Sequence, residues 1–264
     1  MRRVKNEVPA VNPTDMHFDI LPSLSHLVLH DTGSRDTARI ITLGHPDLLP
    51  ALKNELLFGD GTFNVVPSLF YQLYTVHAKV GTSYPPAIYF LLPNKQQRTY
   101  TKMLKILKEI VPECDPKSFL LDYEKAMINS VKATFPNCEV NGCFFHLCQC
   151  VIRHVSAVGL KKEYESNIDF SILVKSLMSL AFVPCADVTT VFDQLCAKFP
   201  DTDACDRLLD YFKQTFIQQE ARNGRPKDPL YKIELWNHFE DGLNCVPKTT
   251  NCTGMLKMMK FRQY

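Results

Sequence analysis

The chain has little net charge and no long apolar run. Its 264 residues carry 30 Lys and Arg against 28 Asp and Glu, which gives a formal net charge of +2. A charge this small does not by itself indicate nucleic-acid binding, so any basic surface has to be local. No apolar run approaches the roughly 18 residues that a membrane span needs, and we expect no contact with a membrane.

A secretory signal and a regular cysteine pattern are also missing. The stretch from Met1 to Glu7 is polar, and the ten cysteines are irregularly spaced. We therefore expect reduced thiols, a location in the nucleus or cytoplasm, and a protein that is not secreted. There is no internal repeat or low-complexity segment. The 45% apolar and 22% charged residues are typical of a globular chain with one large domain or two modest ones.

Hydrophobic periodicity predicts a mixed α/β fold. An irregular N-terminal lead-in precedes two runs that favour a hairpin, and the next three strand-like runs have short connections that favour an antiparallel meander. Strands then alternate with helices, and after residue 145 we expect helices only. The expected strands are 27–31, 38–44, 56–66, 69–80, 87–92, 119–121 and 140–145; the expected helices are 99–111, 124–135, 147–158, 168–181, 187–199 and 206–218.

Two aspartates stand at the ends of hydrophobic runs. Asp60 follows the run 56–59, and Asp122 follows the run 118–121. Strands of one sheet can bring such carboxylates side by side, and a pair of carboxylates suits Mg²⁺ or Mn²⁺, which promote phosphodiester chemistry. There are other interpretations. Asp60-Gly61 is also a common turn, and Asp122 is placed to cap the helix that begins at Glu124, where Glu124 itself complements the helix dipole.

A Cys-x-x-His pattern follows the second aspartate. Cys143 and His146 supply two of the four ligands that zinc usually takes, and Cys150 and His154 lie on the same predicted helix face as His146. Zinc is therefore one interpretation. The favoured one is that these residues belong to the core, because a free cysteine packs like a small hydrophobe.

A series of motifs, taken together and in order, resembles the catalytic domain of Mutator-like element (MULE) transposases. The resemblance spans roughly residues 48–247, with matching text in 60–63, 65–74, 87–95, 122–126, 142–149, 211–212 and 234–237. It implies a ribonuclease H-like mixed sheet with an all-helical insertion. It also implies cleavage and transfer of transposon-end DNA with two Mg²⁺ or Mn²⁺ ions. The resemblance assigns Asp60 and Asp122 as metal-binding catalytic carboxylates, and Cys143 and His146 as auxiliary residues.

The chain departs from the family at the position where the family has its third acidic residue. Gly254 occupies that place in the stretch 248–255, and the following residues no longer look like the family. We expect a truncated or decayed copy whose catalysis is impaired. One alternative is an inactive, domesticated or decayed remnant that only binds DNA or protein. Another is a metal-dependent nuclease that uses Glu234, Glu240 or Asp241 instead.

The expected organisation has four parts. Residues 1–47 form the lead-in with its short hairpin, and residues 48–160 form the ribonuclease H-like catalytic core. A helical insertion follows over residues 161–245, and residues 246–264 form a truncated C-terminal segment.

Overall fold

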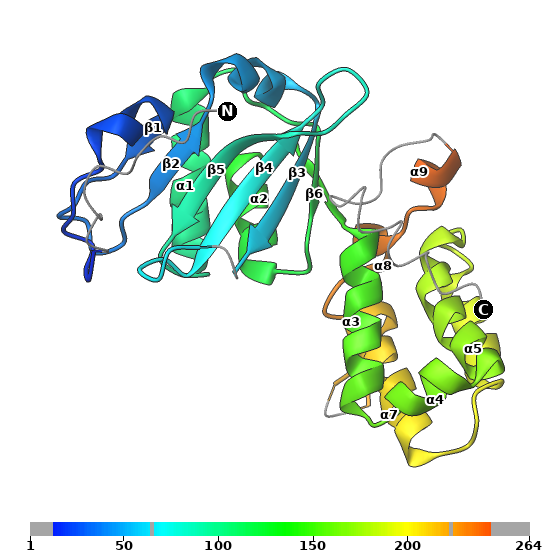
Figure 1. Ribbon diagram of the computed structural model, residues 1–264. Coiled ribbons are helices and arrows are strands. Elements are labelled where there is room, and N and C mark those ends of the chain that lie inside the picture. Colours follow the sequence, from blue (N-terminus) through cyan, green and yellow to red (C-terminus); the bar gives the residue numbers. More distant parts are fainter. Residues whose placement is uncertain (1–12, 64–65, 222–223, 244–264) are drawn as a thin grey trace. The chain divides into compact units, whose positions relative to one another are not determined.

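The computed structural model describes residues 13–63, 66–221 and 224–243, which form two compact units (Figure 1). The first unit comprises Met1–Glu55 and Asp60–Asp115, and the second comprises Leu56–Gly59 and Pro116–Tyr264. Each unit is described by itself, because their relative position is not determined.

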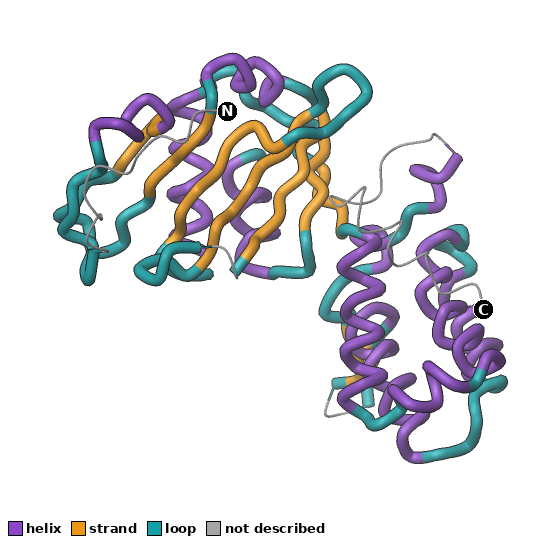
Figure 2. The backbone as a smooth tube through the Cα atoms, viewed as in Figure 1, coloured by secondary structure: helices purple, strands orange, loops and turns teal. Residues whose placement is uncertain are grey.

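Within the described residues, one mixed sheet has the strand order β1-β2-β5-β4-β3-β6-β7 (Figure 2). The neighbours β1-β2, β2-β5 and β5-β4 pair antiparallel, whereas β3-β6 and β6-β7 pair parallel. The mixed α/β class and the N-terminal hairpin are therefore confirmed. The strands are β1 (Val28–Asp31), β2 (Ile41–Gly44), β3 (Leu56–Thr62), β4 (Gln72–Ala78), β5 (Pro86–Leu92), β6 (Ser118–Leu121) and β7 (Glu139–Gly142).

The first unit contains helix α1 (Gln97–Ile110), which contacts β1, and the short helices η1 (Pro22–Leu27) and η2 (Pro46–Lys53). The predicted apolar face of α1 is buried, with Met103, Leu104 and Leu107 fully covered. Tyr100 connects this helix to β4: its hydroxyl accepts a hydrogen bond of 2.7 Å from Gln72. Amphipathic periodicity thus produces the helix, and burial of its apolar face fixes it on the sheet.

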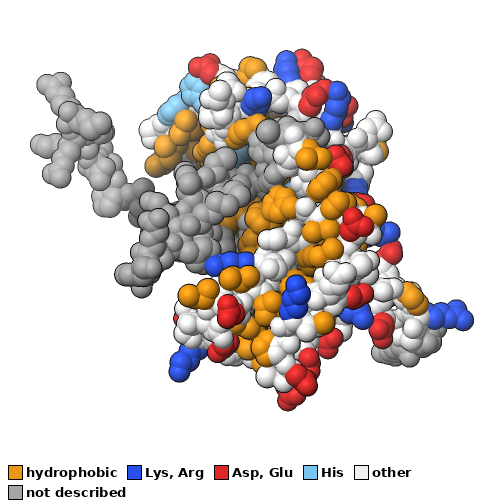
Figure 3. Space-filling view, turned by 90° about the vertical axis from the view of Figure 1, so that its right-hand side faces the viewer, with side chains coloured by type: hydrophobic (Ala, Val, Ile, Leu, Met, Phe, Trp, Pro, Cys, Tyr) orange, Lys and Arg blue, Asp and Glu red, His pale blue; other side chains and the backbone are white. Residues whose placement is uncertain are grey.

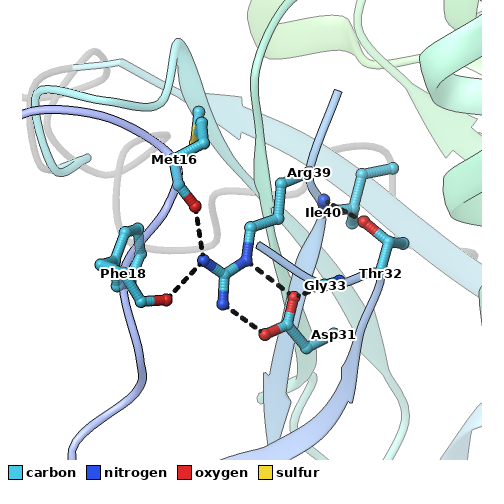
Figure 4. Close-up of polar contacts among 7 residues, drawn as sticks. All are labelled: Met16, Phe18, Asp31, Thr32, Gly33, Arg39 and Ile40. Atoms are coloured by element: carbon cyan, nitrogen blue, oxygen red, sulfur yellow. Dashed lines mark hydrogen bonds and ion pairs between the residues drawn. The ribbon is translucent and has the colours of Figure 1, made fainter. Parts of the chain in front are cut away.

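A buried arginine fastens the lead-in to the hairpin (Figure 4). Arg39 is 2% exposed, and its Nε and Nη2 donate to the two carboxylate oxygens of Asp31 at 2.9 and 2.6 Å. Its Nη1 donates to the backbone oxygens of Met16 and Phe18, each at 2.8 Å. Burying a guanidinium is tolerable only when its donors are satisfied, and these contacts provide that. The bonds from Arg39 lower the pKa of Asp31.

The second unit contains β6, β7 and a helical core. Helix α3 carries Leu147, Val151 and Val155 into a cluster shared with α5, α6 and α7. Gly159, with φ of +87°, follows the end of α3, as predicted. The helical elements are α2 (Lys125–Thr134), α3 (Phe144–Ala157), α4 (Lys161–Ser166), α5 (Ile168–Ser179), η3 (Leu180–Phe182), α6 (Val188–Cys196), α7 (Asp203–Phe212), η4 (Lys213–Ile217), α8 (Ile233–Trp236) and α9 (Phe239–Leu243).

The expectation of helices only after residue 145, and with it the all-helical insertion, is wrong. Strands β8 (Gln219–Glu220) and β9 (Pro226–Lys227) pair antiparallel in a separate ribbon. Two-residue strands are too short to show an alternating pattern, so periodicity does not reveal them. The strand expected at 140–145 ends at Gly142, because Cys143 takes the N-cap position of α3.

Helix α5 keeps part of its apolar surface in solvent. Ile168 and Ile172, one turn apart, are 78% and 53% exposed. The buried side of the helix is formed by Val174, Leu177 and Met178 instead. Figure 3 shows hydrophobic side chains reaching the surface between charged ones. Apolar residues on the surface are common in folded proteins, and single ones need no partner.

Candidate functional site

The two aspartates follow a buried pair of parallel strands. Strand β3 pairs with β6 so that Leu57 lies opposite Phe119 and Phe58 lies opposite Leu120. All four side chains are at most 2% exposed, as expected for continuous apolar runs in central strands. Asp60 comes two residues after Phe58, and Asp122 comes two residues after Leu120. Ligand sites in sheets of this kind lie at the carboxyl ends of parallel strands.

Asp60 lies in a strand and not in a turn, because β3 continues to Thr62. Next to it, Gly61 passes close to β4. A Cβ atom at Gly61 would lie 2.7 Å from Gln72 Oε1 and 3.7 Å from ring atoms of Phe63 and Tyr74. Glycine therefore lets this end of β3 approach its neighbours. Asp60 belongs to the first unit and Asp122 to the second, so the pairing of their carboxylates stays a prediction.

The surroundings of Asp122 come from distant parts of the second unit. Its negative charge contributes to raised pKa values of Cys150 in α3 and of Tyr231, although burial is the larger cause for both. The pKa of Tyr231 rises to about 12. The N-cap of α2 is Glu124, two residues beyond Asp122, and its side chain forms no capping hydrogen bond. Asp122 thus lies near a thiol and a phenol that both stay protonated at neutral pH.

Tyr123, the residue after Asp122, is held on three sides. Its ring lies 5.1 Å from that of Tyr231 and 5.7 Å from that of Phe216, both in edge-on contact. A Cβ atom at Gly142 would lie 2.6 Å from the Tyr123 hydroxyl, so only glycine fits beneath this ring. Burial, with a smaller effect of Cys143, raises the pKa of Tyr123.

Tyr231 also fixes the backbone at this point. Its hydroxyl donates to the carbonyl oxygen of Tyr123, 108 residues earlier in the chain. This role of Tyr231 was not predictable from the sequence, because Tyr231 lies outside the motifs that resemble the family. The segment preceding α8 therefore supports the residue next to Asp122.

The Cys-x-x-His residues join β7 to α3. Cys143 is fully buried, and its backbone N–H donates to Leu121 at 2.7 Å. His146 lies in the first turn of α3, where its ring is 5.5 Å from that of Phe145. The hydrogen bond from Cys143 to Leu121 thus joins the start of α3 to the end of β6, and Leu121 is the residue before Asp122.

The two later residues of the predicted zinc face contact the same tyrosine. Cys150 contributes, after burial, to the raised pKa of Tyr211, and the His154 ring stacks on that of Tyr211 at 3.8 Å and 10°. Across the described ranges, no group of three or more His, Cys, Asp or Glu residues has a metal-holding arrangement.

The alternative third acids lie in α8 and α9. Asp241 Oδ2 is 2.9 Å from Nδ1 of His238, which is fully buried. Glu234 and Glu240 both contribute, after burial, to the raised pKa of Cys185, so both lie near that thiol. Gly254 and its neighbours at 248–255 lie outside the described residues.

A comparison with family models identifies this part of the chain. From β3 to the first half of α3, a stretch that contains both aspartates and the Cys-x-x-His residues, the sequence matches a domain of transposases. Specifically, the model of the MULE transposase domain matches residues 56–150. Residues 56–150 of the chain thus form a MULE transposase domain.

No curated protein matches the chain. Within the part of the chain that the structure describes, no helix has both the length and the apolar character needed to cross a bilayer.

Proposed function

We propose that this domain is ribonuclease H-like and acts in DNA transposition, cleaving and transferring DNA strands with two divalent ions. Asp60 and Asp122 are the proposed metal ligands. The observation that supports this most is the parallel register of β3 and β6, which pairs Phe58 with Leu120 two residues before each aspartate. In our proposal the same register continues to the two carboxylates.

The donor set fits Mg²⁺ or Mn²⁺, which prefer carboxylate oxygens. Bound ions would activate a water molecule or a 3′-hydroxyl and stabilise the leaving oxygen. The protein's own contribution is to hold the carboxylates in place. Tyr231 and Gly142 restrain Tyr123, and Cys143 ties α3 to the end of β6. Cys143 and His146 are auxiliary in this sense.

We infer that catalysis is impaired. In-line phosphoryl transfer needs ions held in fixed geometry, and Gly254 offers no side chain where the family carries its third acid. The second candidate function is a remnant that keeps DNA or protein binding without catalysis. The first function implies transposon-end DNA as the partner, and for both functions we propose a location in the nucleus or cytoplasm.

A Mn²⁺ titration followed by electron paramagnetic resonance tests the metal site. Asp60→Asn and Asp122→Asn should each weaken Mn²⁺ binding at least tenfold, because each removes a charged ligand. Asp47→Asn is the matched control, since this carboxylate in η2 is 86% exposed and lies outside the proposed site. Unchanged Mn²⁺ affinity in Asp60→Asn would contradict the assignment. Cleavage of transposon-end DNA in Mg²⁺ then separates an active domain from a binding remnant.

A further inference from the structure

Three side chains of the first unit form a small exposed group, which we name the aromatic–lysine cluster: Phe63, Tyr71 and Lys95. The Phe63 and Tyr71 rings are 5.7 Å apart at an interplanar angle of 71°. The Lys95 Nζ lies 4.2 Å from the centre of the Phe63 ring and 5.9 Å from that of Tyr71. Both distances are those of cation–π contacts.

The sheet holds this cluster in place. Phe63 follows β3, Tyr71 precedes β4, and Lys95 comes three residues after β5. Because Gln72 pairs with Leu92, the start of β4 and the end of β5 meet at one edge of the sheet. The backbone N–H of Tyr71 also donates to Leu92 at 2.8 Å. The two aromatic side chains are therefore preorganised without being buried.

Their exposure sets these rings apart from the other aromatic residues on the same strands. Phe63 is 41% exposed and Tyr71 is 53% exposed, whereas Tyr74, two residues into β4, is 1% exposed. Two neighbouring rings that keep this much surface in water, with an ammonium group over that of Phe63, offer exposed aromatic surface beside a positive charge. That combination suits a ligand with a planar ring and an anionic group.

The cluster lies next to the proposed catalytic carboxylate. The Phe63 ring reaches within 3.7 Å of the position that a Cβ atom would take at Gly61, the residue after Asp60. A ligand on the cluster would therefore lie at the same end of β3 as Asp60.

We propose that the aromatic–lysine cluster binds one unpaired nucleobase of a DNA strand, with Lys95 contacting the adjacent phosphate. The inference rests on the proposed function for its choice of DNA. Bases stack on exposed aromatic side chains regardless of sequence, and lysine supplies the charge that the phosphate needs. Enzymes that modify a base hold it out of the helix and stack it between aromatic or apolar side chains. A protein partner fits the cluster less well, because a specific interface buries about 800 Å² on each side and two rings offer far less.

The test measures DNA binding by fluorescence anisotropy with the full chain and with divalent ions removed by EDTA. The probes are a blunt duplex, the same duplex with a short single-stranded extension, and that extended duplex with abasic sites in place of its unpaired bases. The wild-type protein should bind the extended duplex about 5- to 150-fold more tightly than the abasic one, which is the contribution expected from stacking one base.

Variants locate this contribution. Tyr71→Ala should bind the extended and the abasic probes with similar affinity, whereas Tyr71→Phe, which keeps the ring, should behave like the wild type. Phe63→Ala serves as a second, independent variant. Lys95→Gln should reduce the slope of the logarithm of the binding constant against the logarithm of the salt concentration by about one on every probe. This is the change expected when one phosphate contact is lost. Thermal unfolding checks that each variant is folded. If a variant does not fold, the comparison of the extended and abasic probes with the wild-type protein still tests the proposal.

The results separate this inference from the proposed function. Equal wild-type affinity for the extended and abasic probes, or no binding to any DNA, overturns the stacking site. The Mn²⁺ titration of Asp60→Asn reports on the metal site independently. Discrimination against abasic DNA in a chain that binds no Mn²⁺ leaves the stacking site standing and rejects the catalytic proposal.

Discussion

Tyr231 donates its hydroxyl hydrogen to the backbone carbonyl oxygen of Tyr123, next to Asp122. This bond joins the segment that precedes α8 to the end of β6. It makes the conformation of the Asp122 backbone depend on residues that lie far away in the sequence. The proposed site is thus supported by the helical part of the second unit as well as by the sheet.

The first prediction concerns that bond. Tyr231→Phe should reduce the free energy of unfolding by about 0.5–1.5 kcal/mol, the usual net value of one hydrogen bond. Urea denaturation followed by circular dichroism measures the change. Tyr89→Phe in β5 is the control, because the Tyr89 hydroxyl forms no hydrogen bond with any described residue. An equal loss of unfolding free energy in both variants would show that the Tyr231 hydrogen bond does not contribute to stability.

The second prediction concerns the glycine beneath Tyr123. Gly142→Ala should reduce stability by about 1–3 kcal/mol, the range for overpacked sites, because the added methyl would lie 2.6–2.8 Å from three atoms of the Tyr123 side chain. Phe216 and Tyr231 pack against that ring, so it has no room to move.

Gly44→Ala provides the contrast to Gly142→Ala. The nearest atom at Gly44 is a methyl of Leu29 at 2.7 Å, on a flexible side chain. Gly44→Ala should therefore lower the urea midpoint less than Gly142→Ala does. A Gly142→Ala protein as stable as the wild type would show that the Tyr123 ring is not fixed.

The central elements were predictable because their patterns are long or uniform. The run at Phe119–Leu121 is entirely apolar, as a strand covered on both faces requires, and it forms the buried core of β6. In α1 the apolar residues Met103, Leu104 and Leu107 recur at intervals of three and four residues, which is the spacing of one helix face. Asp60 and Asp122 were found because each follows such a run.

Other features depend on contacts that a sequence does not encode locally. Alternation puts Tyr71 and Tyr74 on opposite faces of the predicted strand 69–80, but it does not say which face is buried; Tyr71 is exposed and Tyr74 is buried. The role of Tyr231 arises only from folding across 108 residues. The β8–β9 ribbon has two residues in each strand, which is too few for any period to appear.

The third prediction is a pH dependence from the first unit. Hydrogen bonds from Arg39 lower the pKa of Asp31, and a hydrogen bond from Lys102 lowers that of Asp36 to about 2. A carboxylate with a lowered pKa in the folded state stabilises the protein above its unfolded value, here 3.8. That contribution disappears as the pH falls through the folded value. Stability should therefore decline from about pH 4 toward pH 2.

Asparagine variants isolate these contributions. Asp31→Asn and Asp36→Asn should each be less stable than the wild type above pH 4, and the difference should shrink as the pH falls. Thermal midpoints measured at several pH values test this. A difference that stays constant down to pH 2 would show that the ionised carboxylates are not responsible.

The last prediction concerns the missing third acid. If Gly254 limits catalysis, Gly254→Glu should raise Mg²⁺-dependent cleavage of transposon-end DNA above that of the native chain, because a third carboxylate completes the grip on the metal ions. A family-like C-terminal helix, grafted after position 254, would support the new side chain. The control combines Gly254→Glu with Asp60→Asn, which should remove the gained activity.

If instead the native chain already cleaves DNA in Mg²⁺ and loses that activity with Asp60→Asn, another acid supplies the third ligand. Glu234→Gln and Glu240→Gln would then identify it, since Asp241 is already engaged with His238.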